Sequence, residues 1–486
     1  MGADSFLNRE DVVMKRKLLA LILALGLMMG TTPVLAAEGE APQAEPLPGW
    51  AAGVLADGYA MGLFGDEIAL THGDTVTLEQ VEAIAGVVAD KLALLGLPQR
   101  APSEEALVLD TTRGGVVNAL YQAAAAYAFP EIDQAPADYL VSVGALCGDG
   151  TGLHLDRPCT VLEAVTMANA LILSLYDQQN AGSLGLLWQA TNGENTLYLL
   201  GSIHTDRNNV YPFHRQLRDI ILTADQVTFE LDFNDQEQIA EFAAMQMYSD
   251  GTTMADHISP ELYQVVVDTA AQMGMDEATV SQYKAWALAS SFQSLAMLDD
   301  ETTGANAVAI DLYVNSKAAN AGIPIDAVET YAFQGGIFDG LSPEYQEVYL
   351  ASGLLMCLDV DTMDQETKDA LTAILGEEAL EPATQEALDA EVALIGTWMD
   401  QWKARDTEGF AAAYPKDEII QSTDELNSKL FTDRDPGMIA YAQEYLEQPG
   451  SHTGLMVVGA GHMIGSAGIV QGLRDLGYTV EVVPAP

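Results

Sequence analysis

Basic residues are scarce in this chain of 486 residues, in which 20 Lys and Arg stand against 71 Asp and Glu and give a net charge of −51. A nucleic-acid partner requires a basic face, and so few cations cannot form one. We therefore expect no nucleic acid among the partners. Wholesale disorder is also excluded, because 49% of the residues are hydrophobic and can form a substantial core. At this length we expect two or three domains.

The chain also lacks several catalytic motifs and contains few cysteines. The chain has no Gly-x-Ser-x-Gly, Walker or His-Glu-x-x-His motif, which argues against a serine hydrolase, a P-loop nucleotidase and a zincin. Its three cysteines are Cys147, Cys159 and Cys357. The first two, 12 residues apart, either form a disulfide after export or remain two unlinked buried thiols, and Cys357 is expected in the core.

The N-terminus has the pattern of a secretory signal. A basic segment at 14–17 precedes an apolar run at 18–29, and small residues follow up to Ala36 and Ala37. We predict a signal peptide over residues 1–36, with Met14 as the possible true start. A transmembrane anchor is the less favoured alternative, because the run is shorter than the roughly 20 residues that cross a bilayer. The mature protein is then secreted or associated with the cell wall, without a transmembrane anchor.

A weak internal repeat follows the signal. After a linker at 37–48, residues 49–180 have helical periodicity, and two copies at 50–88 and 136–172 share a helix, a glycine-containing turn and a second helix. Thr77 with Gln80, and Thr160 with Glu163, have the spacing of capping boxes. Each pair therefore predicts the start of a helix.

The repeat resembles the S-layer homology module, with a degenerate middle unit at 110–116 that contains Arg113. This resemblance implies that an all-helical domain binds a cell-wall polymer; the alternative is a helical domain with no anchoring role. Residues 37–182 hold 20 acids and four bases. Bulk charge would oppose an anionic polymer, so binding would rely on placed groups such as Arg113.

From residue 185 to 486 the pattern changes to short apolar runs alternating with helices. It predicts an α/β domain with a largely parallel central sheet flanked by helices, and a helical insertion at about 342–446. The predicted strands are 197–200, 226–231, 323–328, 455–458 and 479–483, and the main predicted helices are 236–248, 259–273, 282–298, 305–321 and 342–358.

Two matching turns follow predicted strands of this domain. Gly201 to His204 and Gly459 to His462 are both Gly-x-x-His segments, in a chain with only seven histidines. In an open α/β sheet, ligands bind beyond the carboxyl ends of the strands. Glycine there allows a sharp bend and a close approach to a ligand. We therefore expect the two histidines to share one site, although either could be a structural turn residue.

Carboxylates follow two other strands at the same predicted edge, namely Glu230 and Glu329. Imidazole nitrogen and carboxylate oxygen are ligands for Zn, Mn, Co or Fe. A metal held with open positions acidifies bound water, and a further carboxylate can act as general base. The pattern thus favours a metal-dependent hydrolytic site.

The segments LYLLGSIHTD, VTFELD, IPIDAVETYAFQ and VVGAGHMIG resemble the signature segments of the TraB/GumN family over roughly residues 186–483. This family includes the TIKI proteins, described as metal-dependent proteases that use two Gly-x-x-His motifs and a glutamate. The resemblance implies a hydrolase, most plausibly a peptidase acting on a peptide or protein substrate. The alternative is a non-catalytic protein that binds a metal, haem or a peptide and is tethered to the cell wall.

The resemblance also implies roles for particular residues. A divalent ion, Mn, Co or Zn, would be held by His204, Glu230 and His462, at turns formed by Gly201 and Gly459. Glu329 and Arg434 would assist, with Arg434 available to an oxyanion or a substrate carboxylate, and Gln334 also matches. One departure is Asp435, where the family commonly has Asn. If that amide orients substrate, Asp435 weakens or redirects activity; if it lies behind the ligands, little changes.

Overall fold

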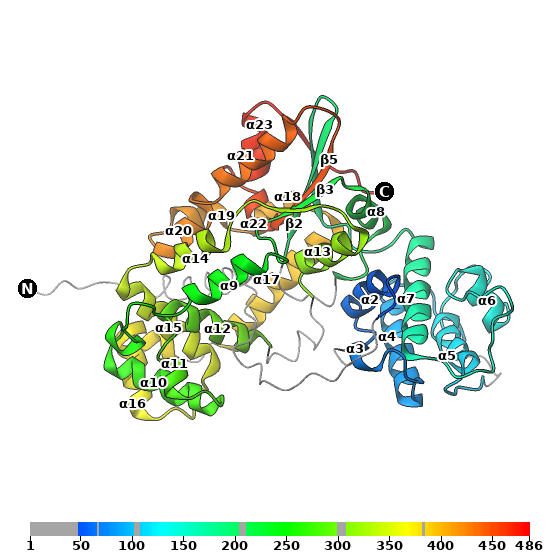
Figure 1. Cartoon of the computed structure of the whole chain (residues 1–486), viewed down its shortest axis with the longest axis horizontal. Helices are drawn as coiled ribbons and strands as arrows, with labels where there is room; N and C mark the ends of the chain where they lie inside the picture. The colour runs from blue at the N-terminus through cyan, green and yellow to red at the C-terminus, as the bar shows by residue number, and fades with distance from the viewer. Residues whose placement is uncertain (1–46, 66–67, 102–106, 204–209, 299–307, 382–383) are drawn as a thin grey trace, which may run out of the picture.

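The computed structural model describes residues 47–486 except 66–67, 102–106, 204–209, 299–307 and 382–383 (Figure 1). The predicted signal peptide and all but the last two residues of the predicted linker lie outside the described residues. A helical region forms the first part of the described chain, and a six-stranded sheet with surrounding helices forms the rest. Within the described ranges, no helix is long and apolar enough to cross a membrane.

The helical region consists of α2 (Ala51–Ala60), α3 (Ile68–Thr71), α4 (Leu78–Ala93), α5 (Arg113–Ala125), α6 (Pro136–Ser142) and α7 (Val161–Gln178). Both predicted capping boxes form, because Thr77 exchanges hydrogen bonds with Gln80 before α4, and Thr160 does so with Glu163 before α7. The Thr112 side chain caps α5 by accepting from the Gly115 amide. The predicted helix starts are confirmed.

The starts of α4, α5 and α7 lie close together. Antiparallel β-bridges pair Thr75 with Thr160 and Thr112 with Pro158, which links the segments that precede the three helices. Cys159 is buried just before α7, whereas Cys147 is exposed, and both thiols are free. The structure thus has the unlinked alternative rather than a disulfide, although only one of the two thiols is buried. Cys357 is partly buried against the core.

The sheet has the order β4-β3-β5-β2-β1-β6. Its strands are β1 (Leu186–Asn192), β2 (Asn195–Ser202), β3 (Gln226–Phe229), β4 (Ile325–Ala327), β5 (Thr453–Gly459) and β6 (Thr479–Val482). β4, β3, β5 and β2 are parallel, whereas β1 runs antiparallel to both β2 and β6. The predicted α/β fold with a largely parallel sheet is confirmed.

Strand β1 was missing from the predicted set. It forms a hairpin with β2 in which Asn192 pairs with Asn195. Gly193 occupies the turn with φ +62°, a left-handed conformation that glycine adopts at little cost. Gly193 and Glu194 are the two central residues of the turn. Glycine at the first central position is a recognised signal for such hairpins, so the sequence did contain the information that places this strand.

Helices cover the sheet and extend away from it (Figure 1). They are α8 (Arg215–Thr223), α9 (Gln236–Met245), η2 (Met254–Asp256), α10 (Pro260–Gln272), α11 (Glu277–Val280), α12 (Ala285–Leu298), α13 (Ile310–Ala321), α14 (Tyr331–Asp339), α15 (Pro343–Cys357), α16 (Gln365–Leu375), η3 (Glu377–Leu380), α17 (Gln385–Ala404), α18 (Thr407–Ala413), α19 (Lys416–Gln421), α20 (Glu425–Thr432), α21 (Asp435–Leu446), α22 (Ala460–Met463) and α23 (Ile469–Asp475). Helices α10, α11, α12, α15 and α16 form a lobe apart from the sheet.

The helical region packs directly on the α/β region, where α2 contacts α13. The Asp57 carboxylate accepts hydrogen bonds from the Tyr313 hydroxyl at 2.6 Å and from Lys317 Nζ at 2.9 Å. Lys91 adds a bond from its Nζ to the Tyr211 carbonyl at 3.0 Å. The two regions are therefore joined by buried polar contacts.

Candidate functional site

The predicted site residues that the structure describes lie at one edge of the sheet. β2, β3, β4 and β5 are parallel, so their carboxyl ends share this edge. Glu230 directly follows β3, Glu329 lies two residues beyond β4, and His462 is in α22 directly after β5. Arg434 immediately precedes α21 and reaches the same place. His204, the other predicted ligand, lies outside the described residues.

Arg434 joins the two glutamates. Its Nη2 donates to Glu230 Oε2 and, at 2.8 Å, to Glu329 Oε2, while its Nε donates to Glu329 Oε1 at 3.0 Å. Gln334 on α14 adds a hydrogen bond from its side-chain amide to Glu329 Oε2 at 2.8 Å. The side chains of Glu230, Glu329 and Arg434 are 1%, 6% and 5% exposed, so these ion pairs are almost entirely removed from water.

The surroundings keep Glu230 ionised. Burial by itself disfavours a charged carboxylate, but Arg434, His462 and the Gly459 amide together outweigh it and lower the pKa of Glu230 to about 2. For Arg434 burial likewise opposes the charged form, yet the two glutamates outweigh it and raise its pKa. Glu230 and Arg434 therefore form a buried ion pair at neutral pH.

His462 is held by a carboxylate on one side and faces another on the opposite side. Its Nδ1 lies 2.6 Å from Asp435 Oδ1, and Asp435 Oδ2 accepts from Lys416 Nζ at 2.7 Å. A carboxylate only accepts hydrogen bonds, so Nδ1 carries a proton, and in the neutral ring Nε2 is the nitrogen that keeps its lone pair. His462 Nε2 lies 3.9 Å from Glu230 Oε1, which also accepts from the Gly459 amide at 2.7 Å.

These groups are of a chemical type that binds metals. The distance of 3.9 Å between His462 Nε2 and Glu230 Oε1 is too long for a hydrogen bond. It is somewhat wider than the roughly 3.4 Å between two ligands of one tetrahedral ion. Among the residues that the structure describes, no group of three or more His, Cys, Asp or Glu side chains could hold a metal. A third ligand would therefore have to come from elsewhere, as predicted for His204.

The two motif glycines have different surroundings. A Cβ at Gly201 would lie 3.0 Å from the Ala460 Cα, so glycine here lets the end of β2 approach the start of α22. The Gly201 carbonyl accepts from Trp402 Nε1 at 2.7 Å. Gly459 contributes its amide to Glu230. Neither glycine has a positive φ.

Some site residues had no signal in the sequence. Lys416 is 1% exposed and belongs to no motif, and its Nζ lies 4.9 Å from the centroid of the Phe431 ring. Asp435 stood out only as a departure from the family pattern, and the structure places it behind His462. Outside the site, His214 lies in a polar stretch of sequence, yet it is 4% exposed and its ring caps α8.

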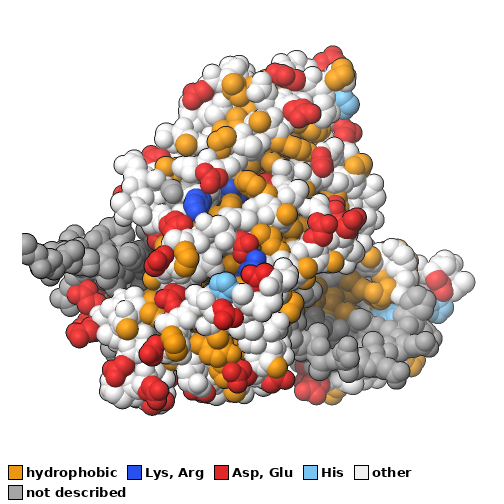
Figure 2. All heavy atoms as spheres, turned by 60° about the vertical axis from the view of Figure 1, so that its left-hand side comes forward, with side chains coloured by type: hydrophobic (Ala, Val, Ile, Leu, Met, Phe, Trp, Pro, Cys, Tyr) orange, Lys and Arg blue, Asp and Glu red, His pale blue; other side chains and the backbone are white. Residues whose placement is uncertain are grey.

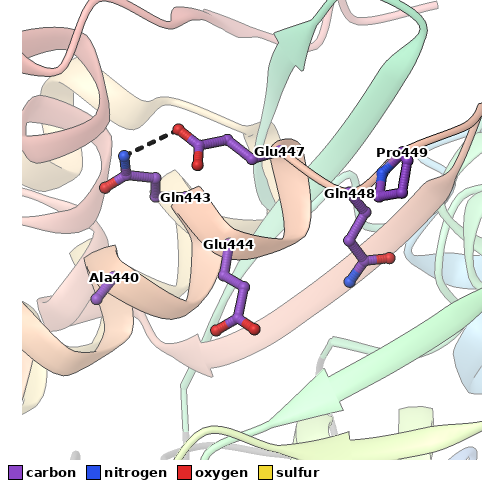
Figure 3. Close-up of a pocket in the computed structure, with 6 residues that line it drawn as sticks. All are labelled: Ala440, Gln443, Glu444, Glu447, Gln448 and Pro449. Atoms are coloured by element: carbon purple, nitrogen blue, oxygen red, sulfur yellow. Dashed lines mark hydrogen bonds between the residues drawn. The ribbon is translucent and has the colours of Figure 1, made fainter.

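A shallow depression of about 370 Å³ lies on α21, lined by Ala440, Gln443, Glu444, Glu447, Gln448 and Pro449 (Figure 3). It occupies the carboxyl half of the helix and the residues that follow, whereas Asp435 and the candidate site are at the amino end. The Gln443 and Glu447 side chains hydrogen-bond to each other beside it. The depression is therefore separate from the candidate site.

The chain matches the model of the TraB/PrgY/gumN family over residues 186–482 and belongs to that family. This range begins with β1 and ends with β6, and it includes every site residue described above. Comparisons with curated proteins and with solved structures gave no match.

Proposed function

We propose that the protein is a metal-dependent hydrolase that acts on peptide bonds. The observation that carries this proposal is the arrangement of His462 Nε2 and Glu230 Oε1, which face each other at 3.9 Å. The predicted ligand His204 follows β2, the strand next to β5 in the sheet. Membership of the family supports the same site, because both Gly-x-x-His segments and Glu230 lie in the matched range.

His204, Glu230 and His462 would hold the ion, which would acidify a bound water and polarise the scissile carbonyl. The chain's own residues would do the rest. Glu329 accepts from Arg434 and Gln334, and its role would be to position Arg434. The guanidinium would stabilise negative charge that develops on the substrate.

Replacing His462 by Ala tests the proposal. Asp435 keeps Lys416 as its partner, so the fold should survive while metal affinity falls at least tenfold and metal-stimulated cleavage of a peptide library is lost. His452→Ala is the matched control, because this histidine precedes β5, at the opposite end of that strand from His462, and its ring hydrogen-bonds to the Pro449 carbonyl. Calorimetry with Mn²⁺, Co²⁺ and Zn²⁺ measures the affinity. Equal cleavage by His462→Ala and wild type, with metal added, would refute the assignment.

A second candidate is a protein that binds a metal, haem or a peptide without turnover. The enclosure of the site favours it, because the side chains of Glu230 and His462 are 1% and 2% exposed. Tight stoichiometric binding with no cleavage of any library peptide would support this candidate over the hydrolase.

We also propose, from the signal pattern at the N-terminus, that the protein is exported. N-terminal sequencing of protein from the culture medium or cell wall should begin at Ala37 or Glu38; an intact residue 1–36 segment would contradict export by this route.

Wall attachment through the helical region remains a separate proposal, and charge does not help it. All four basic residues of this region are engaged: Lys91 with the Tyr211 carbonyl, Arg100 with Asp133, and both Arg113 and Arg157 with Glu163. On the face seen in Figure 2, which belongs mainly to the α/β region, acidic side chains are widespread and basic ones are few. Any binding of the whole protein to purified wall polymer should therefore resist added salt, and salt-sensitive retention would contradict this expectation.

A further inference from the structure

The candidate ligand His462 is one of three buried polar side chains joined by hydrogen bonds, and Asp435 and Lys416 are the other two. Lys416 begins α19, Asp435 begins α21 and His462 lies in α22. Lys416 Nζ donates to Asp435 Oδ2 at 2.7 Å, and Asp435 Oδ1 lies 2.6 Å from His462 Nδ1. The three side chains are 1%, 3% and 2% exposed. Three separate elements therefore meet in one line of hydrogen bonds.

An aromatic ring also packs against this line of hydrogen-bonded groups. The Phe431 ring lies beside both ends, with its centroid 5.2 Å from that of His462 and 4.9 Å from Lys416 Nζ. Lys416 Nζ also approaches the His462 carbonyl at 3.4 Å. Lys416 thus contacts the backbone of the histidine and, through Asp435, its ring.

We propose that Lys416 and Asp435 are a positioning pair that fixes the His462 ring with Nδ1 protonated and Nε2 directed at Glu230. Asp435 supplies the acceptor that selects this tautomer and ring orientation. Lys416 supplies the charge that makes a buried carboxylate tolerable at that point. The catalytic meaning of the pair rests on the proposed function, but the positioning itself does not.

The two members are expected to act as one unit. Without Lys416, Asp435 is a buried carboxylate that has lost its hydrogen-bonded cation, and without Asp435, Lys416 is a buried ammonium that has lost its hydrogen-bonded carboxylate. Single substitutions therefore mix a loss of stability with a loss of positioning. An amide at position 435 would offer His462 the same kind of acceptor without the charge. Because the amide is uncharged, it would not require the lysine as a counter-charge.

Two double variants separate the two effects. Asp435→Asn with Lys416→Met, and Asp435→Leu with Lys416→Met, both remove the buried ion pair and are uncharged at these positions. Only the first keeps an acceptor for the proton on His462 Nδ1. Both should fold, as judged by thermal unfolding, and Asp435→Ala with Lys416→Met serves in place of the Leu pair if that one does not.

The first measurement is the tautomer of His462 in the metal-free protein. Long-range ¹H–¹⁵N NMR in alkaline buffer reports which ring nitrogen carries the proton, and His462→Gln identifies the signal among seven histidines. Wild type and the Asn pair should show Nδ1 protonated. The Leu pair should shift toward protonated Nε2, and its affinity for Mn²⁺ or Zn²⁺, measured by calorimetry, should fall 10- to 100-fold.

Two results would overturn the positioning role. One is a Leu pair that keeps the wild-type tautomer and metal affinity; the other is an Asn pair that loses both, which would make the charge and not the acceptor decisive. Failure of the proposed function gives a different result, in which wild type binds no metal and cleaves no peptide while the tautomers follow the expected pattern.

Discussion

The helical region and the α/β region each contain a glutamate bound by arginine at the end of an element, and the two clusters do different things. In the helical region Glu163 accepts from Arg113 and Arg157 and also completes the capping box of α7. In the α/β region Glu230 and Glu329 share Arg434 beyond the ends of β3 and β4. The Glu163 side chain is 26% exposed, whereas that of Glu230 is 1% exposed.

The difference shows that an ion pair alone does not mark a functional site. Both side-chain carboxylate oxygens of Glu163 accept from a guanidinium or a backbone amide, and this completes the cap at the start of α7. Glu230 has the same kind of partners, but its Oε1 also faces His462 Nε2 at a distance that is not a hydrogen bond. The feature that points to chemistry is this pair of candidate ligand atoms facing each other.

The comparison predicts that removing Arg434 lowers the free energy of unfolding more than removing Arg113 does. Arg434→Met would leave Glu230 and Glu329 buried without their cation and should lower the free energy of unfolding by about 3–5 kcal/mol. Arg113→Met leaves Glu163 with Arg157 and should cost about 1–2 kcal/mol. Urea unfolding followed by far-UV circular dichroism measures both.

Arg215→Met is the control for the loss of an arginine, because its pair with Asp219 is exposed on α8. Such pairs contribute less than about 1 kcal/mol. Equal costs for the Arg434 and Arg113 variants would remove the distinction between the two clusters.

The contact between the regions gives the next largest effect. Asp57→Ala would leave the Tyr313 hydroxyl and Lys317 Nζ without their carboxylate at the α2–α13 contact, at a cost of about 2–3 kcal/mol. We expect the helical region to unfold at a lower temperature than the α/β region in this variant, as seen by calorimetry. Asp90→Ala, at an exposed position on α4, is the control, and identical traces for the two variants would show that the regions do not depend on this contact.

Part of the site could be predicted because it follows from strand order. Glu230, Glu329 and His462 each follow an apolar strand, and carboxyl ends of parallel strands share an edge, so their convergence needed only the assumption of a parallel sheet. Arg434 was accessible only through the family resemblance. It comes from the helical segment between β4 and β5, and periodicity alone does not say which helix end meets the sheet.

The remaining parts depended on contacts over long distances in the sequence. Lys416 reaches Asp435 and His462 only because α19, α21 and α22 pack together, and no local pattern encodes that packing. Strand β1 is a different case, because the glycine of the Gly193-Glu194 turn marks the hairpin locally. A pattern of strands separated by helices does not include an antiparallel hairpin, in which two strands follow each other directly.

Acid should affect the two glutamate clusters differently, and Glu163 allows a direct test. Hydrogen bonds from Arg157 lower the pKa of Glu163 below its usual value of 4.5, against the opposing effect of burial, and the Thr160 amide and Arg113 help. Because the folded pKa is the lower one, the contribution to stability is complete above pH 4.5 and is lost as the pH falls through the folded pKa. The partly exposed position keeps this contribution below about 1 kcal/mol.

Glu163→Gln removes the titrating group and keeps the cap, since Gln80 fills the same capping position in the first turn of α4. The stability difference between wild type and this variant should therefore shrink between neutral pH and about pH 3. A difference that stays constant over this range would mean that Glu163 has the same pKa in the folded and unfolded states.

The smallest expected effect comes from two tyrosines, one in each region. The hydroxyls of Tyr139 in α6 and Tyr414 after α18 are buried and have no hydrogen-bond partner among the described residues. Burial raises the pKa of both, and the nearby Asp435 carboxylate raises that of Tyr414 further. Replacing either by Phe removes an unsatisfied polar atom, so the free energy of unfolding should stay constant or rise by up to about 1 kcal/mol. A loss of stability confined to Tyr414→Phe would show that this hydroxyl has a partner beside the candidate site, and would distinguish it from the Tyr139 hydroxyl in the helical region.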